Sequence, residues 1–355
     1  MAILLAVGAL LMISAYGFAV WFVDPPTVNR PVVSAPPVVE EAAVEGADED
    51  QEKIIAALPV PRAREDRIYT ILVAGEDDGF GGNDVIMVVV VNATAGSIDV
   101  LSIPRDTMVN VPWGLKKINS IQHMHRYLPE TFDHYIYALA AQVEKLVGFP
   151  MDHWVTVDLD GFIDLVDAVG GVEFDVPRRM SYHDPFQDLR IDLAPGVQRL
   201  NGYQAMQLVR YRGYVEGDIA RIAVQQDFMS ALSGQLLRAR NILAVDDLIR
   251  AFRDNVDTSL TLRNLAYLAM EFLQMESENI NFHAVDASIA NIGDNVHGIS
   301  YVSLFVEPWL ELINTHLNPH PWEIQAEDLE ILTRDRATGE FFTTNGAPFS
   351  NNWIR

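Results

Sequence analysis

Short apolar runs separated by polar turns dominate the chain from residue 67 onward. Ile68–Ala74 is one such run, and Val85–Val91 is a second in which apolar side chains follow one another without alternation. A strand without alternation is typical of a sheet that is covered on both faces. A third strand, Gly96–Ile103, ends at Pro104, which has no N–H to donate to a ladder. If the second and third strands form an antiparallel hairpin, the start of one lies beside the end of the other.

The rest of this region alternates strand-like runs with segments of helical periodicity, which predicts an α/β domain over residues 67–316. The further predicted strands are Phe149–Val157, Val172–Val176, Leu189–Leu193 and Ile280–Val285. The predicted helices are Ser120–Tyr127, Phe132–Val147, Asp160–Val169, Gly202–Arg210, Ile219–Arg240, Ala244–Asp254, Thr261–Glu276 and Val302–His316.

The two ends of the chain differ from this domain in composition. Residues 1–23 carry no charge and, at 1.5 Å per residue, are long enough to cross a bilayer, which predicts one transmembrane helix. A cleaved signal peptide is the alternative, but the run exceeds a usual signal core and no small-x-small site follows it. Residues 24–66 are rich in proline and acidic residues, which predicts an extended linker. We therefore expect a single-pass protein of the cell membrane with its domain outside the cytoplasm, and an extended tail over residues 317–355.

Overall charge limits the classes of ligand. The chain has 25 basic and 49 acidic residues, a formal charge of −24, which disfavours nucleic-acid binding. An anionic ligand would need a local cluster of arginines. Cysteine is absent, so there is no disulfide framework and no thiolate site. The nine histidines show no metal-ligand spacing and no nucleophile elbow is present, which disfavours zinc hydrolases and Ser-His-Asp enzymes.

Charged residues gather at the predicted hairpin edge and in two later segments. Arg105 and Asp106 follow the third strand, at the edge where open α/β sheets bind ligands, and Asp84 precedes the second strand at the same edge. The alternative is a simple cap, with Asp106 accepting backbone N–H groups. The later segments are Arg210-Tyr211-Arg212 at a helix end, and Asp218, Arg221 and Gln225, which fall on one helix stripe. The alternative for the stripe is an intrahelical ion pair of a few tenths of a kcal/mol.

Taken together, these motifs resemble the LytR-CpsA-Psr family, membrane-anchored enzymes that attach glycan polymers to bacterial peptidoglycan. The resemblance runs from about Arg67 to Arg240, and each motif is weak alone, but their shared order is specific. In chain order the motifs are Gly75-x-Asp77, Asp84, Ile103–Thr107, Lys117–Asn119, Val166–Val172, Gly196 with Leu200–Gly202, Arg210–Arg212, and Asp218 with Arg221 and Gln225.

The resemblance implies a central mixed β-sheet flanked by helices on both faces. It also implies a polyprenyl phosphate- or pyrophosphate-linked glycan as donor, a peptidoglycan hydroxyl as acceptor, and Mg²⁺ as cofactor. Asp84 and Asp106 match the metal ligands, and two carboxylates about 4 Å apart repel by roughly 4 kcal/mol at an effective dielectric of 20, which a shared cation or a shared proton relieves. Oxygen ligands favour magnesium. The implied catalytic residues are Arg105, Asp106, Asp218 and Arg221, and the implied substrate-binding residues are Asp77, Lys117, Arg210, Arg212 and Gln225.

Three positions depart from the family pattern. Asp78 and Gly79 stand where an arginine usually follows Gly-x-Asp, Gly82 replaces an arginine before Asn83-Asp84, and Val224 replaces one before Gln225. Since each charge-assisted hydrogen bond contributes roughly 1.5–3 kcal/mol, phosphate binding depends more heavily on the remaining arginines. Two functions stay open: a glycopolymer phosphotransferase, and a non-catalytic module that binds polyprenyl phosphate and organises cell-wall assembly.

Overall fold

A computed structural model of the chain describes residues 24–28, 67–75, 82–185, 189–214, 218–239, 256–335, 338–349 and 351–353. The predicted transmembrane segment, most of the predicted linker and the predicted helix Ala244–Asp254 lie outside these residues. Within the described ranges, none of the helices combines the length and apolarity needed to cross a membrane.

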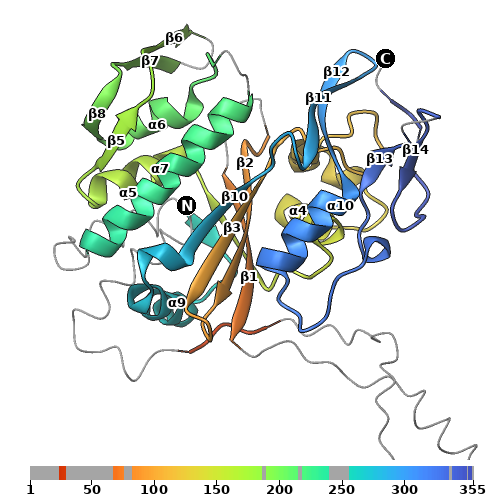
Figure 1. Cartoon of the computed structure of the whole chain (residues 1–355), viewed down its shortest axis with the longest axis horizontal. Coiled ribbons are helices and arrows are strands. Elements are labelled where there is room, and N and C mark those ends of the chain that lie inside the picture. Colours follow the sequence, from red (N-terminus) through yellow and green to blue (C-terminus); the bar gives the residue numbers. More distant parts are fainter. Residues whose placement is uncertain are drawn as a thin grey trace, which may run out of the picture.

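A six-stranded sheet forms the centre of the domain (Figure 1). In sheet order its strands are β10 (Ile280–Ala284), β3 (Ser97–Ile103), β2 (Val85–Asn92), β1 (Ile68–Gly75), β4 (His153–Val157) and β9 (Val256–Thr258). β2 pairs antiparallel with both β1 and β3, as the hairpin prediction requires. β4 runs parallel to β1 and β10 parallel to β3, so the sheet is mixed. The expected mixed sheet is confirmed.

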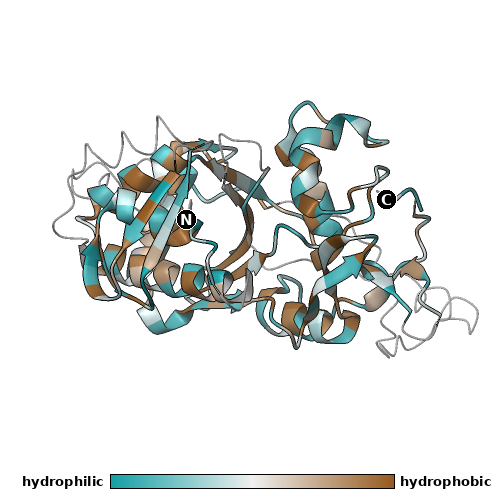
Figure 2. Ribbon diagram, turned by 90° about the horizontal axis from the view of Figure 1, so that it is seen from above, coloured by the Kyte–Doolittle hydropathy of each residue, from teal (hydrophilic) through white to brown (hydrophobic). Residues whose placement is uncertain are grey.

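Both faces of the sheet are buried, which explains the unbroken apolar sequence of β2. Met87 and Val89 point into a core that contains side chains of the helices on one face, whereas Ile86 and Val88 point into the opposite core. The first face is covered by α5 (Leu159–Ala168), α6 (Gly202–Arg210), α7 (Asp218–Ala239) and α9 (Leu262–Gln274), and the second by α4 (Tyr135–Val147) and α10 (Val306–Leu312). Each fully buried Val or Ile contributes about 1.5–3 kcal/mol. Figure 2 shows the helices striped with polar and apolar residues around this sheet.

The start of α6 is fixed by its local sequence. Asn201 accepts the N–H of Gln204, whose side chain in turn accepts the N–H of Asn201, a capping box that satisfies two backbone donors. Gly202 lies against α5 so closely that a Cβ there would sit 2.2 Å from the carbonyl oxygen of Ile163. These features hold α6 tightly on α5, and α6 ends at Arg210.

Four two-stranded sheets and six short helical segments complete the described part. The sheets are β5 (Val172–Val176) with β8 (Gly196–Leu200), β6 (Met180–Asp184) with β7 (Leu189–Leu193), β11 (Ala290–Val296) with β12 (Ile299–Leu304), and β13 (Leu332–Arg334) with β14 (Phe341–Thr343). The short segments are η2 (Ile118–Ser120), α3 (Ile121–Met124), η3 (His125–Tyr127), η4 (Ser277–Asn279), η5 (Ile313–Leu317) and η6 (Ala326–Asp328).

Three predictions differ from the structure. The predicted linker is not extended over its described residues 24–28, because Pro26 is buried, Asp24 pairs with Arg263, and the carbonyl oxygen of Thr27 lies 3.0 Å from Nε2 of His153. The predicted helix Val302–His316 begins too early, because Val302 belongs to β12, which pairs with β11, and the helix starts only at Val306. The segment after Leu317 is not an extended tail in its described part. Leu329 and Ile331 are fully buried in the core beneath α4 and α10, and β13 and β14 form a hairpin. The burial of these apolar side chains stabilises the C-terminal segment against the domain.

Candidate functional site

The antiparallel register of β2 and β3 creates the charged edge. Ile86 pairs with Ile103, so Asp84, before β2, lies beside Arg105 and Asp106, after β3. Nη1 of Arg105 donates to Oδ1 of Asp84 at 2.5 Å, and Nε of Arg105 lies 4.0 Å from Oδ1 of Asp106. The structure therefore brings the two predicted carboxylates to one sheet edge, with an arginine between them.

The turn that carries Arg105 and Asp106 is held by distant backbone. The N–H of Thr107 donates to the carbonyl of Pro104, and the N–H of Val302 in β12 donates to the carbonyl of Asp106. On the other side, the N–H of Asn119 donates to the carbonyl of Arg105 at 3.2 Å. These bonds fix the turn against β12 and against the Lys117–Asn119 segment, so its two charged side chains have a defined direction.

Lys117 is the cationic partner of Asp106. Its Nζ lies 2.9 Å from Oδ1 of Asp106 and stands 5.7 Å from the ring centre of Tyr301 on β12. The side chains of Asp106 and Lys117 are each only 17% exposed, so their attraction is screened less than that of a surface pair. Burial raises the pKa of Tyr301 and keeps its hydroxyl protonated.

The segments after α6 and along α7 bring further arginines to the same place. Nη2 of Arg212 donates to Oδ2 of Asp84 at 2.9 Å, so each oxygen of this carboxylate has a guanidinium partner. Arg221, on α7, is 8% exposed, and Nε2 of Gln225 one turn later donates to the carbonyl of Val209 at 2.8 Å, which ties α7 to the end of α6. Burial raises the pKa of the nearby Tyr214 to about 12, and Arg221 opposes this rise.

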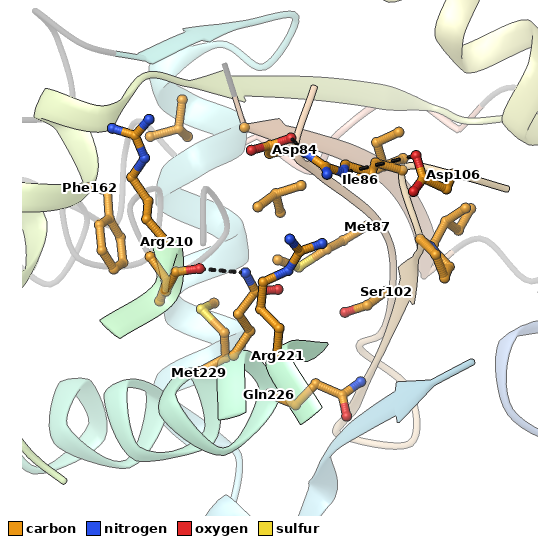
Figure 3. Close-up of a pocket in the computed structure, with 18 of the residues that line it drawn as sticks. Asp84, Ile86, Met87, Ser102, Asp106, Phe162, Arg210, Arg221, Gln226 and Met229 are labelled. Carbon is orange, nitrogen blue, oxygen red and sulfur yellow. Dashed lines mark hydrogen bonds and ion pairs between the residues drawn. The ribbon is translucent and has the colours of Figure 1, made fainter. Parts of the chain in front are cut away.

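A pocket opens from this charged edge into the space between the sheet and α7. Figure 3 shows Asp84 and Asp106 at one side of it, Arg221 reaching in from α7, and Met87 and Met229 along its walls. Four arginines line the pocket: Arg105, Arg210, Arg212 and Arg221. The apolar walls come from β2, β3, α5, α7 and β10 and include Ile103, Phe162 and Phe282. The arrangement suits an amphiphile with an anionic head and an apolar chain.

Asp84 and Asp106 also provide a donor set that fits Mg²⁺. Magnesium in phosphate-transfer sites is commonly held by one or two protein carboxylates together with phosphate oxygens and water. A third carboxylate that lines the pocket, Asp158, is already used as the N-cap of α5, where it accepts the N–H of Gly161 at 2.7 Å. Asp84 and Asp106 are therefore the carboxylates that would hold such a cation.

The other predicted site residues divide into two groups. Arg105, Asp106, Lys117, Arg210, Arg212, Arg221 and Gln225 all lie at the charged edge or the pocket. Asp77 lies in 76–81, outside the described residues, and α7 begins at Asp218, whose side chain is not part of the description. The sequence gives no local signal for Phe282 or Tyr301, because both reach the site from strands about 200 residues after β2.

The structure gives a physical reason for one departure from the resemblance. Gly82 has φ of +77°, and a Cβ at this position would sit 2.7 Å from the carbonyl oxygen of Asn119. Any side chain here is strained and crowded. The backbone at Gly82 therefore does not accommodate the arginine of the family pattern without strain. Val224, on α7, is partly buried and packs against the core.

Comparison with known proteins identifies the family of the chain. The model of the LytR_cpsA_psr family matches residues 38–315. The chain belongs to this family. A relative from Corynebacterium glutamicum, "Probable cell wall biosynthesis protein LcpB", is 39% identical over 159 residues, which cover 44% of the chain and 35% of the relative.

Further family members support the same fold. "Polyisoprenyl-teichoic acid--peptidoglycan teichoic acid transferase TagV" of Bacillus subtilis is 29% identical over 220 residues, 61% of the chain and 54% of the relative. The crystal structure of Bacillus subtilis TagV superposes with a TM-score of 0.57 and 26% identity, covering 71% of the chain and 96% of TagV as crystallised. The chain thus spans about a third to a half of these curated relatives and shares its mixed sheet and flanking helices with a solved family member.

Proposed function

We propose that this LytR-CpsA-Psr family member is a phosphotransferase that moves a polyprenyl-pyrophosphate-linked glycopolymer onto a hydroxyl of peptidoglycan. The observation that carries the proposal is the continuity of the arginine-rich edge with the apolar pocket beside α7. A pyrophosphate between a sugar and a polyprenyl chain has the same division into an anionic centre and an apolar tail. TagV, a relative of the chain, is named as a polyisoprenyl-teichoic acid–peptidoglycan teichoic acid transferase.

The arginines supply preorganised positive charge. Arg105, Arg210, Arg212 and Arg221 converge on the pocket, so a bound pyrophosphate meets guanidinium groups instead of water. Arg105 and Arg212 are held in place by Asp84, and Lys117 by Asp106, so these side chains are ordered before a ligand binds. Mg²⁺ on Asp84 and Asp106 would supply additional positive charge to the phosphate oxygens.

The reaction needs no covalent intermediate with the protein. The acceptor hydroxyl oxygen forms a bond to the phosphorus that carries the glycan, and the bond from that phosphorus to the bridging oxygen breaks, which releases polyprenyl phosphate. The hydroxyl proton passes to a carboxylate, for which we propose Asp218, three residues before Arg221 on α7. The apolar walls near Phe162 and Met229 exclude water from the lipid side of the pocket.

Location at the membrane is the second part of the proposal. Met1–Val23 is uncharged and long enough to span a bilayer, and the segment that follows it up to residue 66 is acidic and rich in proline. We therefore propose a single-pass anchor with the domain outside the cytoplasm. Protease added outside intact cells should remove the domain, and a full-length product in the soluble cytoplasmic fraction would refute the anchor.

A binding module is the alternative, and two observations favour it. Both oxygens of Asp84 are occupied by guanidinium groups, and Gly82 and Val224 carry no charge where the family pattern has arginine. In that case the protein holds polyprenyl phosphate and organises other wall enzymes without transfer.

One experiment separates the two functions. The whole chain is incubated with a polyprenyl-pyrophosphoryl glycan, Mg²⁺ and peptidoglycan fragments, and released polyprenyl phosphate is measured beside lipid binding. Metal-dependent release that requires acceptor supports the transferase. Lipid binding that persists without metal, with no transfer to any acceptor offered, supports the binding module.

A further inference from the structure

Three side chains that can bind a metal meet on the opposite face of the sheet from the pocket. Asp99 is on β3, His283 is on the edge strand β10, and His316 is on η5 at the end of α10. Along β3, Val100 points into the core on the pocket side, whereas Leu101 points into the other core. Because strand side chains alternate, Asp99 shares the face of Leu101 and lies away from the pocket.

The geometry of the three side chains is close to that of a coordination site. Nε2 of His283 lies 2.9 Å from Oδ1 of Asp99, and the rings of His283 and His316 are 4.4 Å apart, tilted by 31°. One ligand atom from each residue can be chosen so that all three lie within 4.8 Å of one another. In a tetrahedral zinc site with bonds of about 2.0–2.1 Å, ligand atoms are about 3.3 Å apart. Binding a metal would require side-chain rotations that bring these atoms closer by up to about 1.5 Å.

The surroundings of these three side chains favour the binding of a cation between them. The side chains of His283 and Asp99 are only 13% and 14% exposed, so a charge on either is poorly solvated. Nδ2 of Asn281 also donates to Oδ1 of Asp99 at 3.2 Å, a contact that orients the carboxylate. His316 is exposed and leaves a path for a metal from solvent.

We propose that Asp99, His283 and His316 form a binding site for a transition-metal dication of the Zn²⁺ class. Two imidazoles and one carboxylate suit this class, whereas Mg²⁺ and Ca²⁺ prefer oxygen ligands only. The site is distinct from the Asp84 and Asp106 pair both in its donor atoms and in its face of the sheet. It does not depend on the proposed transfer reaction.

The placement of the ligands indicates what the metal does. β10 is an edge strand that pairs only with β3 within the described sheet, and η5 follows α10 near the C-terminal part of the domain. A metal bound by Asp99, His283 and His316 links β3, β10 and η5. Two of these ligands, Asp99 and His283, are 184 positions apart in the sequence. Metal binding therefore stabilises the folded domain and holds the edge strand and the helix end together.

Metal titration of the whole chain tests this proposal. The protein is purified without a polyhistidine tag, stripped with a chelator and kept in excess Mg²⁺, which occupies oxygen-only sites. Zn²⁺ affinity is measured against a chromophoric chelator, and Co²⁺ is added to record the visible absorption of a tetrahedral site. We expect one equivalent of Zn²⁺ to bind and to raise the melting temperature.

Variants assign the bound metal to these residues. His316→Gln changes an exposed ligand and should weaken Zn²⁺ binding by more than about ten-fold, as should Asp99→Asn, with loss of the melting-temperature shift. His183→Gln, at an exposed histidine on β6, is the matched control and should retain both. Asp84→Asn should also retain both. If the wild-type chain binds no Zn²⁺, or if His316→Gln binds it as tightly as the wild type, the proposal is wrong.

Discussion

Arg105 donates to Asp84 at 2.5 Å across the edge between β2 and β3, and the same carboxylate accepts from Arg212. A carboxylate shared by two guanidinium groups keeps both near the place where a phosphate would bind. It also competes with that phosphate for them. The site is thus ordered in advance, and its response to mutation separates the roles of charge, geometry and metal.

Arg105→Lys keeps the charge but removes the planar fork. Lysine lacks the planar fork that lets an arginine donate directed N–H groups to Asp84 and to a phosphate oxygen at once. Release of polyprenyl phosphate should therefore slow by about 10–100-fold, which corresponds to the loss of one charge-assisted hydrogen bond of roughly 1.5–3 kcal/mol. The rate is measured with lipid-linked glycan, Mg²⁺ and acceptor. Arg179→Lys, at an exposed arginine paired with Asp192, is the control and should retain the wild-type rate. Equal rates for both variants would remove Arg105 from the site.

Asp84→Asn changes one charge without changing size. Without the carboxylate, Arg105 and Arg212 lose their anionic partner, so metal-free binding of inorganic pyrophosphate should tighten several-fold. Mg²⁺-dependent transfer should be abolished, because one of two metal ligands is lost. Calorimetry with and without Mg²⁺ measures both effects, with Asp192→Asn as control. Unchanged magnesium binding in Asp84→Asn combined with Asp106→Asn would contradict the metal assignment.

The charged edge was predictable because its causes are local. The unbroken apolar run of β2, the short turn after it and Pro104 together determine the hairpin register, and the register places Asp84 beside Arg105. The arginines after α6 and on α7 follow from helix periodicity and from the family resemblance. For these residues, sequence order and strand pairing were enough.

Contacts between distant segments were not predictable in the same way. β11 contains Gly293 and alternates irregularly, with a register shift between Ile292 and Asp294, so its sequence does not indicate a strand. In the C-terminal segment, polar residues and prolines separate the apolar residues, and Leu329 and Ile331 show no repeat long enough to identify them as core. The histidines lack ligand spacing along the chain, yet His283 and His316 meet Asp99 because β10 pairs with β3.

Lipids of different chain length test whether the apolar part of the pocket binds the lipid chain. Phe282, on the edge strand β10, lines the pocket and is partly buried, so Phe282→Ala removes apolar contact area that a bound chain would cover. Burial of a whole Phe side chain contributes roughly 1.5–3 kcal/mol, and about half of that corresponds to a loss of affinity of about three- to ten-fold. We expect this loss for a long polyprenyl phosphate, measured by calorimetry in detergent. A short-chain analogue with the same head group is the control and should bind the variant and the wild type equally. An equal loss for both ligands would place the effect on the fold and not on the lipid.

Lys116 lies next to the site residue Lys117 but is fully buried. Its Nζ donates to the carbonyl of Val111 at 2.5 Å and to Oδ1 of Asn352 at 3.1 Å, and it stands 5.7 Å from the ring centre of Trp353. Burial lowers the pKa of Lys116 from 10.5 to about 8. The described residues 351–353 therefore help to enclose an amine that is partly neutral in mildly alkaline solution.

This lowered pKa makes the stability depend on pH in a defined direction. Between about pH 8 and 10.5 the folded chain has released the proton of Lys116 while the unfolded chain still binds it, so this residue makes the free energy of unfolding rise with pH across that window. Lys116→Met removes the proton difference and should flatten the slope, as measured by urea unfolding at a series of pH values. Lys145→Met, at a more exposed lysine paired with Glu330, leaves Lys116 in place and should retain the wild-type slope. A slope that is the same in Lys116→Met and in the wild type would show that Lys116 stays protonated in the fold, held by the carbonyl of Val111 and the ring of Trp353.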